Sequence, residues 1–107
     1  MEARTQPNRW IILKLEDIYK VFAMWSGGYL DPDAWQLNSG IKSVEDAGEF
    51  WLFNGFSGSV YQCRKDGYGT TGSGGMIVSS WMQQDPNIEI MPSDFDPMTI
   101  STTAGTQ

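Results

Sequence analysis

The stretch EFWLFNGFSGSVYQCRKDGYGTTGSGG, residues 49–75, decides the predicted fold. It contains the densest aromatic run in the chain, the single cysteine and most of the internal glycines. At its start, Phe50 and Leu52 face one side of a strand, and Trp51 and Phe53 face the other. Apolar residues on both sides are typical of a central strand that is covered on both faces. The alternative is that one of these faces is left open for a partner.

The residues after this strand predict a hairpin. Residues 54–58 have turn chemistry, and residues 59–65 return as a second strand on which Tyr61 and Cys63 share a face. The neighbouring Arg64 cannot activate the cysteine, because successive residues of a strand point to opposite faces. We therefore interpret Cys63 as a buried structural residue and not as a nucleophile.

Residues 67–75 form a glycine-rich loop before a predicted helix at residues 76–84. GYGTTG, residues 67–72, matches the G-x-G-x-x-G pattern of dinucleotide-binding turns. The match lies within a chain of short hairpins, and a chain with 12 glycines produces such matches by chance. A weaker alternative is that the backbone N–H groups and hydroxyls at the start of the helix hold an anion or phosphate, or cap the helix. The residues of this alternative site are Gly69, Thr70, Thr71 and Ser73.

The segment at residues 9–25 fits two patterns. Residues 15, 18, 19 and 22 have helical spacing, whereas the alternation before Glu16 fits a strand. We predict a hairpin that turns at Glu16–Asp17, because β-branched and aromatic residues prefer strands.

The predicted fold class is α+β: a mainly antiparallel sheet of short, hairpin-connected strands with one helix near residues 76–84. We place one domain at residues 9–92, between a flexible N-terminus at residues 1–8 and a flexible C-terminal tail at residues 93–107. The other predicted elements are a turn at residues 31–33, a strand at 35–39, a bulge at Gly40, a strand at 41–44, a connection at 45–48, a helix stop at 85–87 and a strand at 88–90.

The composition excludes several classes of function. The chain has no histidine, which removes most catalytic constellations and most zinc and redox-metal sites, so we expect neither an enzyme nor a metal or cofactor. The net charge of −6 argues against direct binding of nucleic acid. We find no apolar run of membrane-spanning length and no signal peptide, and a single cysteine fits a reducing compartment. We therefore expect a cytoplasmic protein with no membrane association.

The aromatic residues are the remaining signal. They make up 13% of the chain, and such residues anchor protein interfaces. The alternative is that they build the core of a small domain. A cluster of carboxylates at residues 85, 89, 94 and 96 is the best local candidate for mimicry of DNA, but thirteen carboxylates in the chain are few for such a mimic, and the main alternative is that the net charge serves solubility. The predicted partner-binding residues are Trp51, Phe53, Phe56 and Tyr61.

Four short stretches carry a resemblance to a known group of proteins. They are Trp25-Ser26-Gly27-Gly28-Tyr29, Trp35-Gln36-Leu37-Asn38-Ser39-Gly40-Ile41, Gly55-Phe56-Ser57-Gly58-Ser59-Val60-Tyr61-Gln62-Cys63 and Tyr68-Gly69. Over about residues 18–82 the chain resembles small bacteriophage- and prophage-encoded proteins that have no assigned activity.

The resemblance implies an accessory protein that binds and inhibits a host protein, such as one of an anti-phage defence system, in the bacterial cytoplasm. A homo-oligomer is also compatible with the sequence. The alternative function is a small-ligand or nucleotide-binding protein that uses the loop at residues 67–75.

Overall fold

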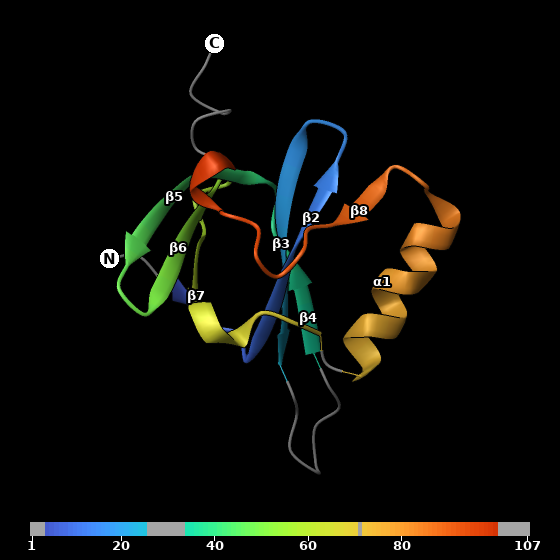
Figure 1. The fold of residues 1–107 in the computed structure, drawn as a ribbon, viewed down its shortest axis with the longest axis horizontal. Helices are drawn as coiled ribbons and strands as arrows, with labels where there is room; N and C mark the ends of the chain where they lie inside the picture. Colours follow the sequence, from blue (N-terminus) through green and yellow to red (C-terminus); the bar gives the residue numbers. More distant parts are fainter. Residues whose placement is uncertain (1–3, 26–33, 71, 101–107) are drawn as a thin grey trace.

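The described part of the chain is a small α+β domain of two four-stranded sheets and one main helix (Figure 1). A computed structural model describes residues 4–25, 34–70 and 72–100. The strand orders are β1-β7-β6-β5 in the first sheet, called the outer sheet, and β4-β3-β2-β8 in the second, called the central sheet. The elements are β1 (Arg4–Thr5), β2 (Arg9–Leu15), β3 (Ile18–Trp25), β4 (Ala34–Leu37), β5 (Ile41–Ala47), β6 (Phe50–Gly55), β7 (Val60–Arg64), the 3-10 turn η1 (Lys65–Gly67), α1 (Gly72–Gln84) and β8 (Ile88–Ile90).

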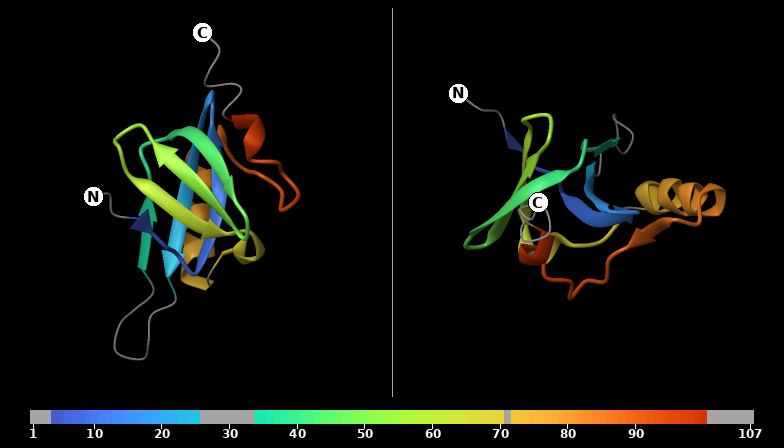
Figure 2. Two further views of the ribbon diagram at one scale, coloured as in Figure 1. Left: turned by 90° about the vertical axis from the view of Figure 1, so that its left-hand side faces the viewer. Right: turned by 90° about the horizontal axis from the view of Figure 1, so that it is seen from above.

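The central sheet lies between the outer sheet and α1, so the molecule has three layers (Figures 1 and 2). Along β2, Trp10 and Ile12 pack against the outer sheet, whereas Ile11 and Leu13 pack towards α1. The same alternation continues on β3. Both faces of these two strands are therefore buried, and their sequence reads as a nearly continuous apolar run.

The predicted β2–β3 hairpin is confirmed. Leu15 pairs with Ile18, and the two-residue turn between them places Glu16 in the left-handed region with φ 56°. The helical spacing that competes with the strand pattern in this segment arises because both faces are apolar. The predicted turn at residues 31–33 lies outside the described residues.

Three other predicted details differ from the structure. The strand with two buried faces is β2 or β3, whereas β6 is an inner strand of the outer sheet and its Phe50 is only half-buried. The bulge lies between Ile41 and Ser43, one step after Gly40, and β5 continues to Ala47. The helix begins at Gly72 and not at residue 76, because packing of its later turns against the central sheet overrides the low helix propensity of glycine.

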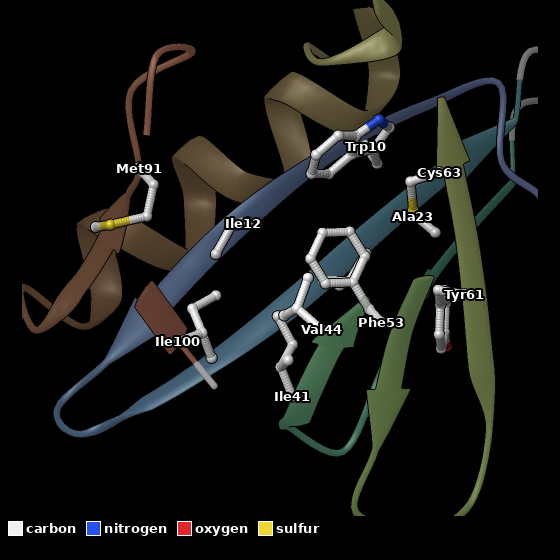
Figure 3. Packing of buried hydrophobic residues seen from close by; sticks show 11 residues of the cluster. Trp10, Ile12, Ala23, Ile41, Val44, Phe53, Tyr61, Cys63, Met91 and Ile100 are labelled. Atoms are coloured by element: carbon white, nitrogen blue, oxygen red, sulfur yellow. The ribbon is translucent and has the colours of Figure 1, made fainter. Parts of the chain in front are cut away.

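The core between the two sheets is built around Phe53, which is fully buried (Figure 3). The segment after β8 contributes to this core. Ile100 is 2% exposed and packs into the core, and Phe95 stacks on Tyr19 with the ring centroids 5.7 Å apart. The packed body therefore extends past residue 92, the predicted domain boundary, to the end of the described residues.

Candidate functional site

The predicted partner-binding aromatics separate into two groups. Phe53 and Tyr61 are 0% and 1% exposed and fill the space between the two sheets (Figure 3). They lie on neighbouring strands, where Phe53 pairs with Tyr61. Their burial removes both residues from any partner-binding surface of this structure, because the inner face of β6 and β7 is covered by the central sheet.

Trp51 is half-buried at the edge of the same core. The Lys65 ammonium lies 4.3 Å from the centroid of its ring, and Lys65 Nζ also donates a hydrogen bond of 2.6 Å to Asp46 Oδ1. Asp46 pairs directly with Trp51 across β5 and β6. The side chains of Lys65 and Asp46 therefore form a clamp beside the Trp51 ring, with the Lys65 ammonium over the ring. Trp51 is for this reason a poor candidate for an open binding surface.

This clamp makes stability depend on pH. The hydrogen bond from Lys65 holds the pKa of Asp46 below its ordinary value of 3.8. The unfolded chain thus takes up the proton more readily, so the stabilisation is complete above pH 3.8 and is lost as the pH falls through the lower folded value. We expect acid titration of the thermal midpoint to show a smaller acid-induced loss for Asp46→Asn than for the natural chain. Equal slopes for the two proteins would contradict the role of the clamp.

Phe56 differs from the other predicted residues because it is 59% exposed. It sits in the turn between β6 and β7, and its N–H donates a 3.1 Å hydrogen bond to the carbonyl of Gly40. The next residue is also held, since the Ser57 N–H donates to Ser39 Oγ at 3.1 Å. Phe56 is therefore an exposed aromatic side chain on a fixed main chain.

Gly40 and Asn38 support this turn, and sequence reasoning did not single out Asn38. Gly40 has φ 138°, and a Cβ atom there would lie 2.8 Å from the Phe56 ring, so the ring packs directly on the glycine. The side chain of Asn38, 4% exposed, accepts a 2.9 Å bond from the Val21 N–H and donates a 3.3 Å bond to the Gly40 carbonyl. The sequence held no signal for this role, because the alternating pattern of residues 35–39 placed Asn38 with Gln36 on the polar side of the predicted strand.

Ile18 completes the exposed apolar site, and it was not among the predicted residues. It is 46% exposed, and its side chain also lies against Gly40. The sequence placed Ile18 at the start of a strand but held no information on the corner formed by residues 38–40. We call Phe56 and Ile18 together the exposed apolar site.

Two polar groups of the glycine-rich segment are committed to internal hydrogen bonds and are not free to bind an anion. The Gly69 N–H donates to the Trp10 carbonyl at 2.9 Å, and the hydroxyl of neighbouring Tyr68 donates to the Met91 carbonyl at 2.6 Å. Ser73 lies inside α1 and so cannot be its N-cap, Thr71 is outside the described residues, and Thr70 lies close to Gly75 of the first helical turn. The hydrogen bonds of Gly69 and Tyr68 hold the loop to β2 and to the residue that follows β8.

The geometry of a dinucleotide-binding unit is also missing from this segment. Such a unit needs two parallel strands of one sheet joined by the helix. Here β7, before the helix, belongs to the outer sheet, whereas β8, after it, pairs antiparallel with β2 in the central sheet.

The ionisable groups form no catalytic arrangement in the described part of the chain. Cys63 is fully buried, and burial raises the pKa of its thiol far above the usual range. In the described ranges, no group of three or more His, Cys, Asp or Glu could hold a metal ion. A shallow cavity of about 170 Å³ is lined by Glu49, Arg64, Lys65 and Asp66. Its two cations are already paired with carboxylates.

Comparison with protein-family models gives no match, and comparisons with curated proteins and with solved structures give none either. No helix within the described residues is long and apolar enough to cross a membrane. The geometry of the exposed apolar site is therefore the basis for a functional proposal.

Proposed function

We propose that this chain is a non-enzymatic accessory protein of the phage type that binds and inhibits a host protein, with Phe56 as the anchor of the contact. The host setting of the proposal rests on the sequence resemblance. The observation that carries the binding role is the exposure of Phe56 on a turn that main-chain hydrogen bonds hold in place. Aromatic residues are enriched among the few side chains that dominate binding energy.

The fixed main chain strengthens this proposal. An aromatic side chain on a mobile loop loses conformational entropy when it binds, and that loss reduces the affinity. Phe56 has already lost much of this freedom, because its ring rests on Gly40 and its N–H is bonded to the Gly40 carbonyl. This preorganisation supports a role for Phe56 as an anchor, and a second exposed apolar residue, Ile18, lies against the same glycine.

The substitution Phe56→Ala tests the anchor. We expect the natural chain to retain a stoichiometric protein from a bacterial lysate, and the variant to bind it at least about tenfold more weakly, as for a typical binding hot spot. The variant should remain folded and lose about 1–2 kcal/mol of stability, because part of the ring is buried. Mass spectrometry identifies the retained protein, and calorimetry with the purified pair measures the affinity.

Met76→Ala is the matched control. Met76 is 75% exposed and lies on α1, across the central sheet from the outer sheet that carries Phe56. Its removal deletes an exposed apolar side chain of similar size and should leave binding unchanged. Equal weakening by both substitutions would place the site elsewhere, and retention of no protein by the natural chain would contradict the proposed function.

A further inference from the structure

The exposed apolar site continues across the central sheet. Ile18 pairs with Leu15 on β2, and Leu15 pairs with Ile88 on β8. Directly paired residues point to the same face of a sheet. Leu15 and Ile88 are half-buried beside the cluster under α1, whereas Ile18 is 46% exposed. The row of Phe56, Ile18, Leu15 and Ile88, with Phe56 joined through Gly40, is called the apolar stripe.

The stripe crosses the strands and does not run along one of them. From Ile18 to Ile88 it covers two inter-strand spacings, or about 10 Å. Residues i and i+7 of an α-helix are also about 10.5 Å apart along one face. Ile90, 38% exposed, lies next to Ile88 on the same face of β8 and widens the stripe at that end. The dimensions therefore match the apolar face of a short helix.

Carboxylates lie beside the middle of the apolar stripe and near its Ile88 end. Glu16 and Asp17 are exposed in the turn that joins Leu15 to Ile18, and Asp85 precedes Ile88 by three residues. Among the described residues, the ion pairs are Arg64–Asp66 and Lys65–Asp46, so the carboxylates of the turn are not neutralised by a lysine or arginine. Lys20 lies on the same face, one row away, where it pairs with Leu13. A partner is therefore favoured if it carries positive charge over the turn.

We propose that the apolar stripe binds an amphipathic helix of the partner protein, with its apolar face on Ile18 and Leu15 and its basic flank over Glu16 and Asp17. This inference rests on the proposed function and names the chemistry of the partner. It uses the recognition mode in which a helix places its i, i+4 and i+7 side chains on an apolar surface. The positive flank faces the turn, and Lys20 disfavours the opposite orientation.

A designed peptide tests this assignment without knowledge of the partner. The probe is an alanine-rich helix of about fifteen residues, long enough to form a helix, with leucines at i, i+4, i+7 and i+11 and lysines on one flank. Two control peptides are a twin with glutamate in place of lysine and a scrambled sequence of the same composition. We expect the basic peptide alone to shift the amide NMR signals of residues 15–20, 56 and 88–90 and to gain helicity in circular dichroism.

Two variants test the contacts separately. Ile18→Ser should lower the affinity for the basic peptide at least about tenfold. Asp17→Lys changes an exposed turn residue that does not contribute to the core. It should lower the affinity for the basic peptide about threefold at low salt, and this difference should disappear at high salt. Lys20→Ala is the matched control and should leave the affinity unchanged or raise it. Equal binding of the acidic twin, or no effect of Asp17→Lys, would overturn the assignment of charge.

Other occupants give different results. A peptide that binds as an extra strand would stay non-helical and shift only the β8 amides, and a second copy of this chain would show concentration-dependent dimerisation in light scattering that Ile18→Ser abolishes. Either result overturns the proposal, as does the absence of binding by the basic peptide.

If a host protein is captured through Phe56 while the basic peptide does not bind, the helix assignment fails and the proposed function stands. If the basic peptide binds as described and no host protein is captured, the helix assignment stands and the proposed function fails.

Discussion

Replacing Trp10 with alanine is expected to cost about 3–5 kcal/mol of folding free energy, the usual range for deleting a large buried aromatic side chain. Trp10 is 2% exposed, and its ring contacts the rings of Phe53 at 5.3 Å and Tyr68 at 4.8 Å. Its indole N–H also donates a 2.7 Å hydrogen bond to the Arg64 carbonyl. One side chain thus joins the central sheet, the outer sheet and the loop before α1. Urea denaturation followed by circular dichroism measures the loss.

Two control substitutions separate the contributions to this effect. Trp10→Phe keeps an aromatic ring but removes the N–H, so the Arg64 carbonyl loses its donor, and a loss smaller than that of Trp10→Ala is expected. Trp35→Ala removes the same residue type from β4, where it is 45% exposed, and should also cost less. A loss for Trp35→Ala equal to that of Trp10→Ala would contradict the central role of Trp10 in the packing between layers.

Replacing Asn38 with leucine is expected to cost about 2–4 kcal/mol, although leucine is similar in size and more apolar. The Val21 N–H is buried in the central sheet and receives no other acceptor when the Asn38 side chain is lost. A buried donor without an acceptor carries the full cost of its desolvation. The change also frees the Gly40 corner on which Phe56 rests, so we expect weaker partner binding together with the lower thermal midpoint.

Asn54→Leu is the control for this prediction. Asn54 is half-buried on β6, and its side-chain amide donates to Ser43 Oγ at 3.1 Å and to Glu45 Oε2 at 3.0 Å at the surface. Water can replace this amide as the donor, so a loss below about 1.5 kcal/mol is expected. Similar losses for the two substitutions would show that Asn38 is not a special support of the β4–β5 corner.

Much of the secondary structure follows from local patterns. The Glu16–Asp17 turn, the β6–β7 hairpin and the stop of the helix at Asp85 agree with the structure, because turn chemistry and alternation act within a few residues. The start of α1 was not predictable in this way. Four residues from Gly72 to Gly75 are helical only in the context of the layer that α1 joins.

The candidate site also combines features that local sequence patterns predict with features that only tertiary packing decides. Phe56 was among the predicted residues, but the same pattern of aromatic residues also selected Phe53 and Tyr61, which are buried. A strand with two apolar faces has the same sequence whether one face is covered by a sheet or left for a partner. The distinction depends on contacts between residues far apart in the chain, such as those of Phe56 and Ile18 with Gly40.

The sequence by itself determined the α+β class, the hairpins and their turns, and the burial of Cys63, because each depends on the periodicity and chemistry of neighbouring residues. Only the tertiary structure decided that β2 and β3 have both faces covered and that Phe56 and Ile18 both lie against Gly40. Those features arise when strands from separate parts of the chain meet, and the free energy of burial then depends on which layers cover which faces.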